Sequence, residues 1–173
     1  MPNNIAVTAI ILNLGNDPVI STDVSLQSLI ILENADLTIE ANNTLSMHEF
    51  LPINSLGILL NQGTVTNNGE ITISSTSGLS KSAIYNIGTF LNDPESTIDI
   101  ENSYGNGIFS SGSFTNYGGT ISIGTVGNVN GNGIVIDADQ FTNRGVTLGN
   151  TIKGIINIDN TTSDGLSISA NGA

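Results

Sequence analysis

The chain contains 173 residues, of which 38% are hydrophobic, 10% charged and 5% aromatic. Its 15 acidic residues outnumber three basic ones and give a net charge of −12, so phosphate backbones and anionic lipid surfaces would be repelled. We therefore expect no nucleic-acid partner and no membrane insertion, and the absence of cysteine excludes disulfides and thiolate metal sites.

Residues 1–54 carry a loose form of the pattern that dominates the rest of the chain. Short apolar segments predict short strands at Val24–Leu26, Leu29–Leu32, Leu37–Ile39 and Thr44–Met47. Terminal repeats of an array are commonly degenerate because they cover the open end of its core. We expect one or two degenerate, capping coils in this part of the chain.

Residues 55–173 hold a regular internal repeat. An asparagine returns at Asn67, Asn92, Asn116 and Asn143, at spacings of 25, 24 and 27 residues. Each unit has an apolar stretch, a Gly-Thr-Val/Phe or similar step into the asparagine, and a strand such as Glu70-Ile71-Thr72-Ile73. Three short strands in about 25 residues predict one coil of a right-handed parallel β-helix, an all-β fold whose equivalent strands stack about 4.8 Å apart.

This register predicts which side chains stack on one another. The alternating strands point their isoleucines to the interior and their polar residues outward. A second interior column takes one residue from each of four units: Val65, Phe90, Phe114 and Phe141. The four asparagines are expected at a corner, in left-handed backbone geometry, where their amides form a hydrogen-bonded ladder between coils.

An antiparallel sandwich is the competing prediction for the fold. Four Asn-Gly pairs, each suited to a type I′ hairpin turn, favour it: Asn68-Gly69, Asn106-Gly107, Asn132-Gly133 and Asn171-Gly172. Hairpin turns alone do not explain why equivalent residues return at near-constant spacing, so the solenoid is the stronger interpretation.

The last units differ from the others in two places. Residues 146–154 form an insertion that we expect to loop out from one side, either as a binding surface or as a plain surface excursion. Leu166 and Ile168 then reproduce the opening of a unit, and no cap follows. We expect an uncapped end that offers unpaired strands to another chain or to neighbouring solenoid repeats, which makes these two residues a candidate self-assembly end.

We predict no catalytic residue, no metal site and no cofactor. The only histidine is His48 and the sequence has no Asp-Asp pair, so the pattern expected of a hydrolase is missing. Arg144 and Lys153 are the only nearby candidates for a lyase base. Two pairs of alternate carboxylates, Asp99 with Glu101 and Asp137 with Asp139, offer two ligands each, which is too few for calcium.

The repeated Asn-x-Gly and Thr-Ile-x-Ile phrases give residues 55–173, about two thirds of the chain, a resemblance to a known family. They resemble the β-helical stalk and passenger regions of bacterial surface and secreted proteins, the pectin-lyase-like superfamily in its non-enzymatic, adhesin-like form. The resemblance implies an extracellular or cell-surface module, structural or adhesive, that stacks end to end in a longer stalk or filament. The alternative is a carbohydrate-binding or polysaccharide-cleaving β-helix that uses a lateral face, with glycans as partners.

Overall fold

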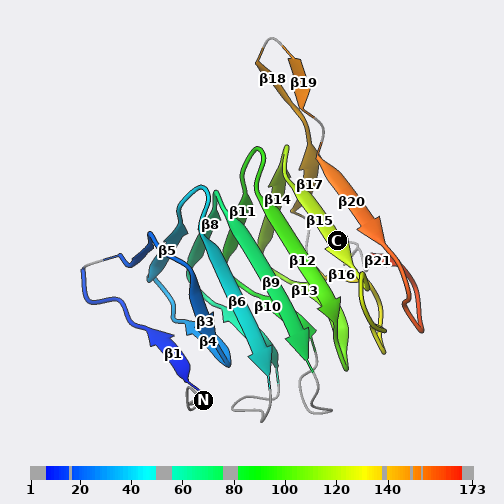
Figure 1. The fold of residues 1–173 in the computed structure, drawn as a ribbon, viewed down its shortest axis with the longest axis horizontal. Helices are drawn as coiled ribbons and strands as arrows, with labels where there is room; N and C mark the ends of the chain where they lie inside the picture. The colour runs from blue at the N-terminus through cyan, green and yellow to red at the C-terminus, as the bar shows by residue number, and fades with distance from the viewer. Residues whose placement is uncertain are drawn as a thin grey trace, which may run out of the picture.

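The computed structural model describes residues 7–15, 17–49, 56–75, 82–137, 140–148, 150–152 and 154–168. In these ranges the chain forms 21 strands, most of them arranged as a three-sided solenoid (Figure 1). None of the described segments is a helix long and apolar enough to cross a membrane.

Three parallel sheets make the sides of the solenoid, and each coil contributes one strand to each sheet. Sheet A contains β1 (Thr8–Ile11), β4 (Ser28–Ile31), β7 (Gly57–Asn61), β10 (Ser82–Asn86), β13 (Asn106–Ser110), β16 (Ile134–Ile136) and β21 (Leu166–Ile168). Sheet B contains β2 (Val19–Ile20), β5 (Asp36–Ile39), β8 (Thr64–Asn67), β11 (Thr89–Asn92), β14 (Ser113–Tyr117) and β17 (Phe141–Arg144). Sheet C contains β3 (Val24–Leu26), β6 (Thr44–Glu49), β9 (Glu70–Ser75), β12 (Thr97–Asn102), β15 (Thr120–Ile123) and β20 (Ile155–Ile158).

The strand register confirms the predicted all-β parallel β-helix. Phe90 pairs with Val65 on one side and with Phe114 on the other, and Phe114 pairs in turn with Phe141. Coils measure about 26 residues, close to the period read from the sequence. The sandwich alternative is wrong, because every pairing within the three sheets is parallel; Asn68 and Gly69 turn a corner between β8 and β9 instead of closing a hairpin.

The core fills the interior of the solenoid with stacked columns of apolar side chains. Strand alternation buries the isoleucines of sheet C as predicted, among them Ile71, Ile98 and Ile121 in one column. Phe90 and Phe114 are fully buried, and their rings stack with centroids 4.8 Å apart and planes 7° from parallel. Burying a large apolar side chain contributes about 1.5–3 kcal/mol, so each fully buried member of these columns stabilises the fold by an amount of that order.

The N-terminal coils join the same sheets as the regular repeats. β4, β5 and β6 pair with β7, β8 and β9, so the sheets run across the predicted boundary at residue 54 without interruption. The first coil is short, since Thr8 and Ser28, 20 residues apart in the chain, share a hydrogen bond of 2.9 Å between their hydroxyls.

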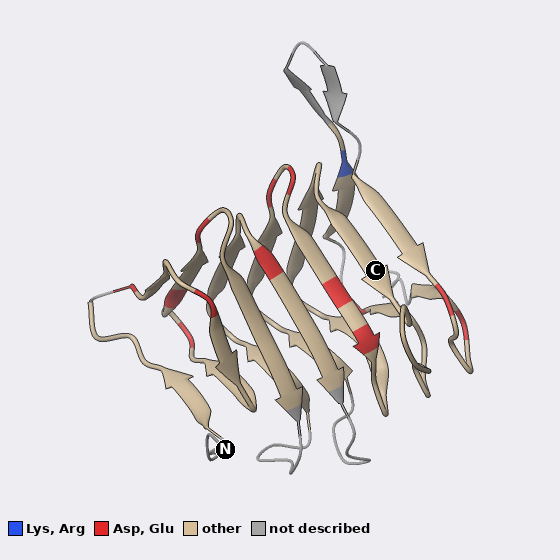
Figure 2. Ribbon diagram, viewed as in Figure 1, with Lys and Arg blue, Asp and Glu red and all other residues tan. Residues whose placement is uncertain are grey.

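The insertion near the C-terminal end forms an antiparallel hairpin. β18 (Val146–Leu148) pairs with β19 (Asn150–Ile152), and the hairpin projects away from the three-sided body (Figure 1). Of the three basic residues only Arg144, at the foot of this hairpin, lies in the described part of the chain, whereas acidic residues are spread over the corners and sheet C (Figure 2).

Candidate functional site: the amide ladders and the C-terminal end

The structure brings the four repeat asparagines together at the corner between sheets B and C. We call this column the B–C ladder: Asn67, Asn92, Asn116 and Asn143. Each Nδ2 donates to the Oδ1 of the asparagine in the following coil, over 2.8 Å at all three steps. The first three residues are fully buried and Asn143 is exposed.

The ladder amides also form hydrogen bonds with the backbone, both at their own corner and in the next coil. Asn67 illustrates this, because its Oδ1 accepts from the Gly69 backbone N–H over 3.2 Å, and its Nδ2 also donates to the Thr97 carbonyl over 3.0 Å. At Gly119 any larger side chain would collide with Asn92 of the ladder, and at Gly69 it would collide with backbone carbonyls of the preceding coil. The corner after Asn92 has Asp93-Pro94-Glu95 instead of a glycine. The buried amides are thereby satisfied, which removes the cost of desolvating them.

The expectation of left-handed backbone at these asparagines is wrong. Asn67, Asn92 and Asn116 lie within strands, and the non-glycine residues with positive φ in the described ranges are Asn34, Asn42, Glu95 and Asn160. Extended backbone is required because the asparagine must point inward, on the same side as the apolar residue two positions earlier in its strand. The residues that follow it make the turn.

Sequence reasoning missed a second ladder at the corner between sheets A and B. This A–B ladder consists of Asn61, Asn86 and Ser110, all buried. Asn61 Nδ2 donates to Asn86 Oδ1 over 2.8 Å, and Asn86 Nδ2 donates to Ser110 Oγ over 3.0 Å. The available signal was the same phrase, Asn-x-Gly or Ser-x-Gly, at the end of each apolar stretch. Ile31 and Ile136 occupy the same column on either side, so this ladder ends inside the solenoid.

The predicted self-assembly end lies where the three sheets meet solvent. Within the described residues, β21, β17 and β20 each pair with a strand on one side only. Leu166 is 52% exposed and Ile168 is 64% exposed, although the preceding members of their columns, Ile134 and Ile136, are 0% and 2% exposed. The side chains that earlier coils bury are therefore open to solvent at this end.

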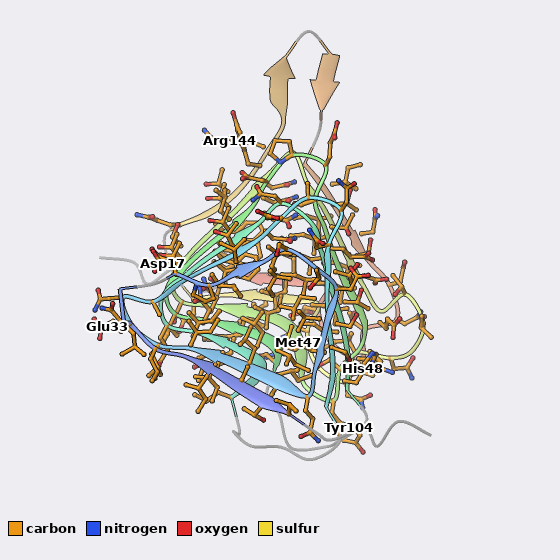
Figure 3. The ribbon with its side chains drawn as sticks, turned by 60° about the vertical axis from the view of Figure 1, so that its left-hand side comes forward. Asp17, Glu33, Met47, His48, Tyr104 and Arg144 are labelled. Carbon is orange, nitrogen blue, oxygen red and sulfur yellow. The ribbon has the colours of Figure 1, made fainter. Side chains whose placement is uncertain are left out.

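The residues considered for chemistry are not brought together. His48 lies exposed on the outer face of β6, next to Met47, which points into the core (Figure 3). Asp99 accepts a hydrogen bond of 2.7 Å from the Thr125 hydroxyl, and the guanidinium of Arg144 lies 4.6 Å from the centre of the Tyr117 ring. Lys153 and Asp139 lie outside the described residues. Among the side chains that the structure describes, no three potential metal ligands gather.

A polar pocket of about 320 Å³ lies on the outside of the B–C corner. Glu70 and Glu95 contribute its two carboxylates, and Glu70 accepts hydrogen bonds from the hydroxyls of Thr44 and Thr72. The contact with Thr44 joins adjacent coils, and the contact with Thr72 lies within β9, so the described contacts of this carboxylate are with the fold itself.

Asp93 follows Asn92 at the same corner, and burial raises the pKa of its carboxyl above the ordinary value of 3.8. The folded protein therefore holds this proton more tightly than the unfolded chain does, so the group makes stability fall as pH rises through the raised pKa. We expect Asp93→Asn to raise the midpoint of thermal unfolding at pH 7, and the gain to shrink as pH is lowered through that range. Thermal scans of both proteins from pH 3 to pH 8 measure it; a gain that is constant with pH would contradict it.

Comparisons with known protein families, with curated protein sequences and with solved structures find no match. The fold therefore defines the class of this protein: it is a parallel β-solenoid held by stacked apolar columns and two amide ladders.

Proposed function

We propose that this protein is a structural or adhesive β-solenoid module of the cell surface or extracellular space, which joins other solenoid coils end to end in a longer stalk or filament. The open C-terminal end carries the proposal. Its strands have one free edge each among the described residues, and Leu166 and Ile168 expose apolar surface that continues the core columns. Unpaired edges of this kind are templates for another strand.

The polar groups gathered by the fold support a structural role over a catalytic one. The amides of both ladders form hydrogen bonds with other ladder residues and with the backbone. For example, Asn92 donates to Asn116, and Asn86 donates to Ser110. A catalytic site needs groups aimed at a substrate, whereas these groups are buried and aimed along the solenoid axis.

The carbohydrate-binding alternative has weaker support. The aromatic side chains on the outer face of sheet A, Tyr85 and Phe109, stack on each other with centroids 4.6 Å apart and planes 18° from parallel. Their flat faces therefore contact one another, and a sugar ring approaching from outside would meet ring edges. We propose glycans as partners only if an end-to-end role fails the following test.

Sedimentation velocity and negative-stain electron microscopy over a concentration series test the proposal. The wild-type chain should form axial assemblies one solenoid wide, and Ile168→Asp should abolish them because it places a charge on the open end. Ile87→Asp is the matched control: Ile87 is also exposed, at 42%, but lies on a side corner between β10 and β11. A wild-type chain that stays monomeric at every concentration, or two variants that behave alike, would refute stacking through this end.

A further inference from the structure

The corner after Asn92 is built differently from the other corners of the B–C ladder. Every other ladder asparagine is followed two positions later by a glycine, whereas Asn92 is followed by Asp93, Pro94 and Glu95. The Ser96 backbone N–H donates to the Asp93 carbonyl over 3.2 Å, and Glu95 has a φ of 66°. Both features are typical of a type II turn, whose third position normally holds glycine. The turn therefore holds a strained glutamate directly after an Asp-Pro peptide bond.

An Asp-Pro peptide bond carries its own nucleophile. The un-ionised carboxyl of the aspartate can attack the backbone carbonyl carbon of the same residue, because a five-membered ring holds the two groups at high effective concentration. The carboxyl proton passes to the proline nitrogen as the C–N bond breaks. The products are a cyclic anhydride and a free secondary amine, and one water molecule then opens the anhydride to two carboxyl groups. The net reaction is hydrolysis of the peptide bond.

Ser96 places two hydrogen-bond donors on the oxygen where negative charge would develop during this attack. Its hydroxyl lies 2.6 Å from the Asp93 carbonyl oxygen, which is the shorter of its two contacts, the other being 2.9 Å to Asn92 Oδ1. The Ser96 backbone N–H is the second donor. Ser96 is only 1% exposed, so these donors are held in place and shielded from water. Donors fixed in this way stabilise the oxyanion formed in acyl transfer.

The Asp93 carboxyl is half-buried and accepts no hydrogen bond from the described residues. Burial raises its pKa above 3.8, so the reactive, un-ionised form is present below the raised pKa and is lost as pH rises through it. The other titratable side chains of the corner are Glu95 in the same turn, Glu70 in the preceding coil and, in the following coils, Tyr117 with Arg144 stacked on its ring. Burial, and not the charge of these neighbours, causes the shift in pKa.

We propose that this protein cleaves its own chain between Asp93 and Pro94 in mild acid, with the Asp93 carboxyl as nucleophile and Ser96 as the oxyanion donor. Pro94 lines the polar pocket at the B–C corner, from which water reaches the bond and opens the anhydride. The strands on either side of the break, β11 and β12, are each paired with strands of both neighbouring coils. The product is therefore a nicked solenoid whose two pieces stay together until the protein is unfolded.

Asp17 and Pro18 form a second Asp-Pro bond, which is an internal control. Both residues are exposed, and no donor among the described residues reaches the Asp17 carbonyl. The two bonds have the same covalent chemistry and differ in their surroundings. A difference between their cleavage rates in the folded protein, absent from the unfolded chain, therefore measures what the fold contributes.

The experiment follows both bonds in the intact protein. The protein is incubated over a pH series wherever circular dichroism shows that it is folded, and its fragments are quantified by mass spectrometry after denaturation. We expect fragments 1–93 and 94–173 to form at least about tenfold faster than fragments 1–17 and 18–173, a modest effect for an oxyanion donor. The faster reaction should slow as pH rises through the raised pKa of Asp93. Asp93→Asn should abolish it and leave cleavage after Asp17 unchanged.

Ser96→Ala tests the oxyanion donor. Cleavage after Asp93 should slow by about tenfold, cleavage after Asp17 should not change, and Ser96→Thr, which keeps a hydroxyl, should restore the rate. A Ser96→Ala rate equal to that of the wild type overturns the proposal. Equal rates at the two bonds in the folded protein, or a preference for Asp93 that persists in guanidinium chloride at the same pH, also overturn it. This last comparison uses the wild-type chain and holds even if Ser96→Ala does not fold.

Discussion

Phe114→Ala should lower the free energy of unfolding by about 3–5 kcal/mol, the usual cost of deleting a buried aromatic ring. Phe114 is fully buried between two other rings, with centroids 4.8 Å from Phe90 and 5.7 Å from Phe141. The cavity cannot collapse easily, because the backbone on both sides is held by parallel strand pairing. Urea unfolding followed by far-ultraviolet circular dichroism gives the value.

Phe109→Ala is the matched control for that measurement. Phe109 lies in the same coil but on the outer face of sheet A, where it is only partly buried and stacks on Tyr85. We expect a loss of about 1–2 kcal/mol, from one aromatic pair and partial burial. Equal losses for the two variants would show that the interior aromatic column is not the main packing element of this coil.

Asn92→Leu should cost about 1–3 kcal/mol, although it conserves side-chain size and adds apolar surface. The change removes the acceptor of Asn67, the donor to Asn116 and the acceptor of the Ser96 hydroxyl. Asn67 and Ser96 keep other bonds, to the Thr97 and Asp93 carbonyls, but the Asn116 oxygen loses its donor inside the core. A buried polar group left without a partner costs about 1–3 kcal/mol.

Thr89→Ala controls for changes on the same strand. Thr89 belongs to β11 and points to solvent, so its replacement should alter stability by no more than about 0.5 kcal/mol. Chemical denaturation of the three proteins compares them directly. If Asn92→Leu were as stable as Thr89→Ala, the ladder would contribute to register but not to stability.

The interior could be predicted from the sequence because stacking imposes the same residue type at each turn. Phe90 and Phe114, and the alternating isoleucines, occupy equivalent positions with nearly constant spacing, so the period alone identifies their columns. The A–B ladder escaped prediction because its asparagines close an apolar run and its third member is Ser110. A hydroxyl replaces an amide there, and a search for repeated asparagines does not find it.

The backbone at the corner could not be predicted from residue type. Asparagine tolerates left-handed geometry more than most residues do, and Asn34, Asn42 and Asn160 adopt it. The ladder asparagines are nevertheless extended, and at the corner after Asn92 it is Glu95 that takes the left-handed conformation. The hydrogen bonds between coils require each amide to point along the solenoid axis, and this requirement outweighs the backbone preference of asparagine. Outward positions are still harder to predict, because they do not pack inside the solenoid and so accept different residue types. One outer column of sheet B, for example, holds Thr66, Leu91 and Thr115.

The uniform direction of the B–C ladder gives the solenoid an electrical polarity. Three consecutive amides donate toward the C-terminal end and accept from the N-terminal side, so their dipoles add in the same sense along the axis. Hydrogen-bonded chains of this kind polarise each member in turn and become cooperative. Each amide therefore strengthens the hydrogen bonds of its neighbours, so the coils that the ladder joins are stabilised together instead of one at a time.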